Sequence, residues 1–162
     1  METVQCTSEL CEAVRAWLSY FEKDLNDAVH GMTMPRLVTA DLEERSFELA
    51  YTLQPWMRNP AGVVHGGITA TLLDQTMGLL VGSLIRDHGI TPTINLNVSY
   101  LRTAPIGITL HVRARALYVG RNIATVTAEA FEEGHSDTLI ASASGSFYTG
   151  GTEGRAPVTA QP

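Results

Sequence analysis

A single carboxylate, Asp74, lies in the middle of an unusually apolar stretch of the sequence. Residues 59–85 read NPAGVVHGGITATLLDQTMGLLVGSLI, and the eighteen residues after the glycine pair carry no other charge. A carboxylate removed from water is strongly destabilised unless it is hydrogen-bonded, paired with a cation or protonated through a raised pKa. The position of Asp74 therefore calls for a reason, and one candidate reason is service as a base. The alternative is a carboxylate held by the hydroxyls of Thr71 or Thr76, or one that faces a wet interface.

Gly66 and Gly67 stand where the apolar stretch begins, and the pattern predicts that they open a helix. The first N–H groups of a helix have no partner within it, and the helix dipole is positive at this end. Because glycine carries no Cβ, a carbonyl that gains negative charge could approach this backbone closely. The pair could equally serve only as a tight turn into the helix. His65, just before the pair, is expected to cap or brace that turn through a ring nitrogen.

The spacing of Gly66 and Asp74 bears on how they could cooperate. Eight helical steps separate them, about 12 Å along the axis, whereas a base must come within about 3 Å of its target. Two copies of the helix packed antiparallel about a twofold axis would place the first turn of each beside the middle of the other. We therefore expect a homodimer with two composite sites, provided that the two groups act together. No third ligand accompanies His65 and Asp74, so a metal site is not expected, and no Gly-x-Ser-x-Gly elbow marks a serine nucleophile.

The elements that position these groups can be predicted from the spacing of apolar residues. Over residues 8–29, apolar residues recur every three or four positions with charged residues between them. This pattern predicts an amphipathic helix that stops near Gly31. Residues 37–41 and 46–53 read as two strands joined by the charged turn LEER. The segment 66–85 is apolar on every side of a helical wheel, as in a buried helix.

The second half of the chain alternates apolar and polar residues, which is typical of strands. Residues 93–101, TINLNVSYL, predict a half-buried strand with Thr93 in its polar set and an apolar set made of Ile94, Leu96, Val98 and Tyr100. Three more antiparallel strands are expected within 107–119, 121–133 and 138–150. One long buried helix followed by such strands predicts an α+β fold in which a curved antiparallel sheet wraps around the helix.

Composition and charge exclude several classes of function. The net charge of −6, with Arg and Lys scattered singly, argues against nucleic acid as a partner. The N-terminus does not resemble a signal peptide, and the apolar stretch is interrupted by a charge and glycines, so no membrane span is expected. Cys6 and Cys11 match no zinc spacing. A reduced, cytoplasmic protein is the simplest expectation.

The segment NPAGVVHGGITATLLD resembles the active-site signature of the hotdog-fold acyl-CoA thioesterases, in particular the phenylacetate-pathway (PaaI-like) group. The resemblance runs from about Leu37 to Tyr148 and includes TINLNVSYLRTAPIG and the later VGRN turn. It implies a hotdog thioesterase domain over 33–149, after the N-terminal helix in 1–32 and before a tail in 150–162 that is expected to be disordered. It also implies dimers that associate into tetramers, and no metal or redox cofactor.

The resemblance further implies a role for each residue of the signature. Asn59 and the Gly66 amide would polarise the thioester carbonyl, with His65 supporting the turn. Asp74 of the opposite subunit would act as general base for water or as nucleophile, and Thr93, where related enzymes often carry Ser, would help to orient the water. The implied reaction is hydrolysis of an acyl- or aryl-CoA to a carboxylic acid and CoA.

Other readings of the same residues stay open at this point. Arg102 and Arg121 could contact CoA phosphates, or they could simply be solvated arginines beside turns. The domain could be a noncatalytic module that binds acyl-CoA, although the single acidic N-terminal helix does not supply the basic helix-turn-helix of a transcriptional sensor. A hotdog dehydratase or hydratase is a third reading. Release of free thiol distinguishes hydrolysis from both.

Overall fold

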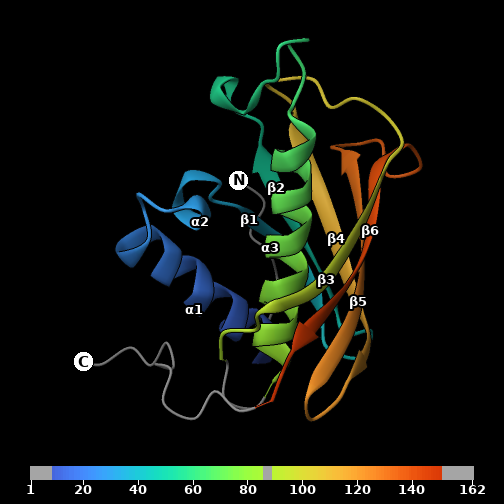
Figure 1. Ribbon diagram of the computed structural model, residues 1–162. Coiled ribbons are helices and arrows are strands. Elements are labelled where there is room, and N and C mark those ends of the chain that lie inside the picture. The colour runs from blue at the N-terminus through green and yellow to red at the C-terminus, as the bar shows by residue number, and fades with distance from the viewer. Residues whose placement is uncertain (1–8, 86–88, 151–162) are drawn as a thin grey trace.

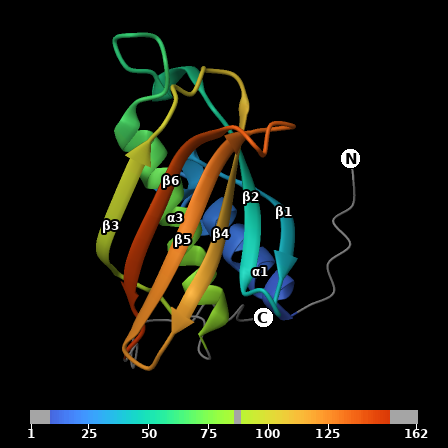
Figure 2. The ribbon, with the colours of Figure 1, turned by 90° about the vertical axis from the view of Figure 1, so that its right-hand side faces the viewer.

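The computed structural model describes residues 9–85 and 89–150, which form one antiparallel sheet and a long helix that crosses it. The sheet has the strand order β1-β2-β4-β5-β6-β3 and curves around helix α3 (Figures 1 and 2). The helical elements are α1 (Glu9–Asp24), α2 (Val29–Met32), the 3-10 turn η1 (Pro55–Met57) and α3 (Gly66–Leu84). The strands are β1 (Arg36–Asp41), β2 (Ser46–Thr52), β3 (Thr93–Tyr100), β4 (Thr109–Val119), β5 (Ile123–Glu132) and β6 (Leu139–Tyr148). The predicted α+β architecture is confirmed.

Helix α3 is buried because its apolar residues meet the inner face of the sheet. Leu72, Leu73, Met77 and Leu80 are completely buried. The strands opposite present mostly small side chains, including Ala114, Ala124, Ala128, Ala130 and Ala141. Small residues on the sheet let the helix approach closely and the larger helix side chains fill the space between them. Tyr51 of β2 adds a polar tie, because its hydroxyl lies 2.8 Å from Thr76 Oγ1.

The predicted N-terminal helix is wrong at its C-terminal end. The helix α1 stops at Asp24, and the separate short helix α2 follows a turn at Asn26 and Asp27. Asn and Asp side chains compete for nearby backbone groups and favour turns over helix interiors. Leu25 O accepts hydrogen bonds from the N–H groups of Ala28 and Gly31. A Cβ on Gly31 would lie 2.2 Å from Leu25 O, so this tight turn requires glycine.

The strand predictions are confirmed, but the apolar face of β3 is not covered as expected. The strand β3 lies at one edge of the sheet and pairs only with β6. Ile94 and Tyr100 are 57% and 54% exposed, whereas Leu96 and Val98 are half-buried. Alternation does not indicate whether another element of the fold covers a strand face, and this face of β3 lies at the edge of the core.

Two further expectations concern the ends of the chain. Cys11 is completely buried on α1 and is disulfide-bonded, so the expectation of reduced thiols is wrong for this residue. The spacing of the two cysteines in the sequence does not indicate whether their thiols are oxidised. Cys6 and the expected disordered tail from 151 onward lie outside the described residues. No helix in the described ranges has the length and hydropathy needed to cross a bilayer.

Candidate active site

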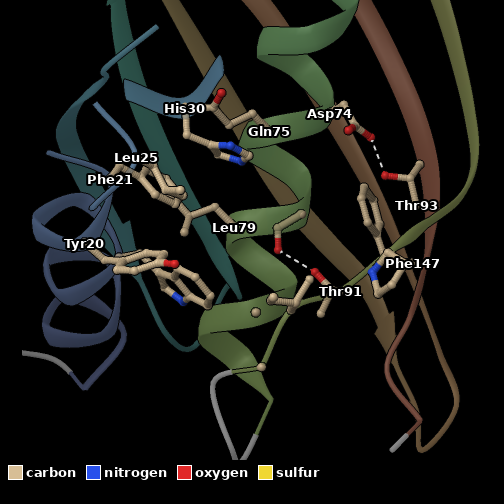
Figure 3. Close-up of a pocket in the computed structure, with 16 residues that line it drawn as sticks. Tyr20, Phe21, Leu25, His30, Asp74, Gln75, Leu79, Thr91, Thr93 and Phe147 are labelled. Carbon is tan, nitrogen blue, oxygen red and sulfur yellow. Dashed lines mark hydrogen bonds between the residues drawn. The ribbon is translucent and has the colours of Figure 1, made fainter. Parts of the chain in front are cut away.

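Asp74 lies half-buried in the middle of α3 and is held by Thr93. The Thr93 hydroxyl donates a hydrogen bond of 2.8 Å to Asp74 Oδ1 (Figure 3). Neither hydroxyl considered from the sequence does so, because Thr71 donates to Gly67 O and Thr76 donates to Leu72 O. Within residues 9–85 and 89–150, no hydrogen bond reaches Asp74 Oδ2. One carboxylate oxygen is thus fixed while the other is open to water or to a ligand.

A β-bulge explains why Thr93 faces the helix. Thr93 pairs with Phe147 and Asn95 pairs with Ser146, so Ile94 is an extra residue in β3. Phe147 is fully buried on the inner face of the sheet, and Thr93 opposite it therefore also points inward. Strict alternation placed Thr93 in the outward polar set, which is wrong. Bulges often re-aim a side chain in this way beside functional sites.

The first turn of α3 leaves a backbone donor free. His65 is the N-cap residue, and its Nδ1 accepts a hydrogen bond of 2.9 Å from the Gly67 N–H. The Gly66 N–H donates to no acceptor in the part of the chain that the structure describes. The Tyr100 hydroxyl donates to Gly66 O at 2.8 Å, and a Cβ on Gly66 would lie 3.4 Å from the Tyr100 ring. Tyr100 thus fixes the turn while the Gly66 N–H stays available at the positive end of the helix.

Asn59 organises the loop that leads into this turn. Its Oδ1 accepts hydrogen bonds from the N–H groups of Ala61 at 2.9 Å and Val63 at 3.4 Å, and its own N–H donates to Val63 O. The side-chain carbonyl is therefore occupied by the loop, as in other Asx turns. The Nδ2 amide has no acceptor among the described residues and is the part of Asn59 that can donate to a ligand.

The predicted site residues form two groups within one chain. Thr93 lies with Asp74, whereas Asn59 and His65 lie with Gly66 at the start of α3, eight helical steps or about 12 Å away. A single acyl carbonyl therefore cannot touch both groups of the same chain.

The two arginines considered for CoA lie in the loops that follow β3 and β4. Arg102 is exposed, and its Nη1 donates to Leu139 O at 2.7 Å. Arg121 is exposed in the turn between β4 and β5. Neither lines the cleft that contains Asp74.

A cleft of about 430 Å³ opens beside Asp74, between α1, α3 and residues 89–93 (Figure 3). Its walls are largely apolar and include the aromatic residues Trp17, Tyr20, Phe21 and Phe147. An apolar cleft with a few convergent polar groups is typical of a small-molecule site. In the described ranges, no group of three or more His, Cys, Asp or Glu side chains is placed to hold a metal ion.

His30 is a cleft residue that the sequence did not single out. Burial lowers the pKa of His30 from its usual 6.5, and the negative charge of Asp74 only partly opposes this effect. The ring packs on Phe21 with 4.5 Å between centroids. Its neighbour in the cleft, Gln75, accepts a hydrogen bond of 2.9 Å from the Thr33 hydroxyl through Oε1. The position of His30 depends on the turn between α1 and α2, which helical periodicity did not predict.

Comparison with known proteins gives one family. The model of the "Thioesterase superfamily" matches residues 61–138. The solved structure of a phenylacetic acid degradation-related protein from Ralstonia eutropha JMP134 is 32% identical, with a TM-score of 0.69 over 82% of this chain and 98% of that chain. A Streptococcus mutans UA159 protein solved with acetyl CoA bound is 23% identical, with a TM-score of 0.60 over 70% of this chain and 86% of that one.

A curated relative from Caenorhabditis elegans, provisionally named an esterase, is 39% identical over 71 residues. The match covers 44% of this chain and 41% of the relative, so it spans less than half the length of that protein.

Proposed function

This chain belongs to the thioesterase superfamily and has its hotdog fold, and from that premise we propose that it hydrolyses acyl- or aryl-CoA thioesters to a carboxylic acid and CoA. The observation that carries the proposal is the pairing of Asp74 with Thr93 at the edge of an apolar cleft. Asp74 Oδ1 is held by the hydroxyl, and the other oxygen is free to receive a proton from water. No additional cofactor is part of the proposal, because CoA arrives with the substrate.

The proposed reaction uses the two groups of residues for different steps. Asp74 removes a proton from a water molecule oriented by Thr93, and the water oxygen bonds to the acyl carbon. The Gly66 N–H and the Asn59 Nδ2 amide donate to the carbonyl oxygen as it becomes negative. The C–S bond then breaks, and the proton held by Asp74 returns to solvent or to the thiolate. Direct attack by Asp74 on the acyl carbon, followed by hydrolysis of the anhydride, uses the same geometry.

The working unit in this proposal is a homodimer, with a dimer of dimers as a further assembly. The separation of about 12 Å between the two groups requires that Asp74 of one protomer meet the helix start of its twin. The edge strand β3 supports such pairing, because in the described residues it has no neighbouring strand on one side, and its Ile94 and Tyr100 are exposed. Arg102 and Arg121, both exposed, are proposed contacts for CoA phosphates.

The test is release of free thiol from a panel of short, long and aromatic CoA thioesters. Asp74→Asn keeps the shape of the side chain but removes the base, and we expect kcat to fall by at least about a hundredfold. The matched control is Asp137→Asn in the loop between β5 and β6, where the carboxylate lies outside the cleft. Near-normal turnover by Asp74→Asn would contradict the proposal. Tight binding of acyl-CoA without thiol release would favour a noncatalytic module instead.

A further inference from the structure

The cleft beside Asp74 continues along α3 well beyond the reacting groups. The α3 residues that line it are Asp74, Gln75, Gly78, Leu79 and Gly82. These positions lie on one face of a helix, and Asp74, Gly78 and Gly82 are stacked at four-residue steps. From Asp74 to Gly82 the groove extends for about 12 Å along the helix axis.

The two glycines in this stripe are present for different reasons. A Cβ on Gly82 would lie 3.1 Å from Gly89 O, tighter than most Cβ contacts, so the close backbone packing favours glycine there. A Cβ on Gly78 would meet only ordinary contacts, 3.4 Å to the Phe147 ring and 3.9 Å to Thr91 Oγ1. Glycine weakens a helix interior relative to alanine. The contacts around residue 78 therefore do not explain why it is a glycine. The effect of the missing side chain is to keep the middle of the groove open.

The walls and the far end of the groove are built from other elements. Tyr20 and Phe21 of α1 form one wall, and Thr91 and Phe147 stand on the other side of α3 (Figure 3). Trp17 of α1 also lines the groove. The position of a Cβ on Gly82 lies 3.7 Å from the Trp17 ring, so Trp17 stands at the end remote from Asp74. The groove therefore has a reactive end at Asp74 and an end bounded by Trp17 and Gly89.

Among the residues that the structure describes, Trp17 Nε1 and Gln75 Nε2 have no hydrogen-bond partner, and both residues are more than nine-tenths buried. Buried polar groups without partners are rare in folded proteins and call for an explanation at each occurrence. Both residues line this groove. An alkyl chain has no acceptor for the two buried N–H donors on these walls, so ordered water beside the chain would have to supply one.

We propose that this groove binds the acyl group of the substrate and admits chains of up to about ten carbons, with Trp17 and Gly89 setting the limit. The length follows from the axial distance, because an extended chain advances about 1.2 Å per bond. This inference rests on the proposed thioester hydrolysis and names its substrate class. Each buried methylene strengthens binding by about a factor of four, so kcat/KM should rise with chain length until the groove is full. Beyond that length it should fall.

The experiment compares kcat/KM for acyl-CoA thioesters from two to sixteen carbons in the wild type and in Gly78→Leu. Gly78 is four residues from Asp74, about 6 Å along the groove. A leucine there should lower kcat/KM for octanoyl-CoA by at least about tenfold, whereas the value for butyryl-CoA should stay within about twofold. Trp17→Leu should move the optimum to longer chains. Ser19→Ala, on α1 but outside the groove, is the matched control, and thermal unfolding checks that each variant is folded.

Different results would overturn the two proposals. A wild-type rate that keeps rising to sixteen carbons, or equal losses for butyryl- and octanoyl-CoA in Gly78→Leu, would refute the groove while leaving hydrolysis intact. If Gly78→Leu does not fold, Gly78→Ala must show a smaller loss of kcat/KM that is again selective for octanoyl-CoA. If the wild type releases thiol from no substrate, hydrolysis fails, and calorimetry decides the groove separately. The wild-type protein must then bind octanoyl-CoA more tightly than butyryl-CoA, and the Gly78 variant must lose this preference.

Discussion

The hydrogen bond from Thr93 to Asp74 allows the loss of rate in a single variant to be estimated. Thr93→Val replaces the hydroxyl by a methyl group and keeps the β-branched shape, so the pairing of β3 with β6 should survive. A hydrogen bond to a charged group contributes about 1.5–3 kcal/mol. Because the 2.8 Å contact lies at an exposed position, we take the lower end, and about 1.4 kcal/mol corresponds to a tenfold change in rate. We therefore expect kcat to fall about tenfold.

The assay is continuous detection of free thiol with the preferred acyl-CoA, which gives kcat and KM separately. KM should change by less than about twofold, because the hydroxyl acts on the base and not on the substrate. Thr93→Ser keeps the donor and should restore most of the rate. A Thr93→Val enzyme with the wild-type kcat would refute the reasoning, and so would a Thr93→Ser enzyme as slow as Thr93→Val.

Three further variants test other contacts. His65→Ala removes the acceptor of the Gly67 N–H and should lower the free energy of unfolding in urea by about 0.5–2 kcal/mol, whereas His65→Asn should recover most of it; equal losses would contradict the cap. Tyr100→Phe leaves Gly66 O without its 2.8 Å bond and should lower kcat several-fold with little change in KM, and an unchanged kcat would show that the turn does not need the hydroxyl. His30 has a pKa below its usual 6.5 in the folded protein because it is buried, so the unfolded chain binds more protons and stability should fall as the pH drops below about 6.5. His30→Phe keeps a ring against Phe21 and should flatten the change in Tm between about pH 5 and 7, whereas parallel Tm curves would contradict this assignment.

Much of the fold could be predicted because its strongest signals are local. The all-round apolar pattern of α3 and the alternation in the later strands arise from burial on defined faces, and both periods are visible in the sequence. The end of α1 was missed because Leu25 and Val29 continue the helical period through a turn that Asn26, Asp27 and Gly31 impose. Periodicity alone could not weigh those turn residues against the apolar pattern.

The part of the candidate site that could be predicted comes from one continuous segment of the sequence. Asn59, His65, Gly66 and Asp74 are close in sequence, and their residue types indicate donors, a cap and a base. Thr93 points inward because of a β-bulge in β3, opposite β6. Residues of the edge strand β3 are exposed because no other element covers them in the described structure. The cleft joins α1, α3 and residues 89–93, which are far apart in the sequence. Such tertiary features leave no local pattern.

The most direct test of the composite site is complementation between two inactive variants. Asp74→Asn removes the base, and Asn59→Asp keeps the Oδ1 acceptor of its loop while removing the Nδ2 donor. If each site takes Asp74 from one protomer and Asn59 from the other, a mixed dimer contains one intact site. An equal mixture, unfolded and refolded together, should therefore recover about a quarter of the wild-type rate of thiol release. Mixed dimers that form, as seen by native mass spectrometry, but show no recovered activity would contradict a site shared between two chains.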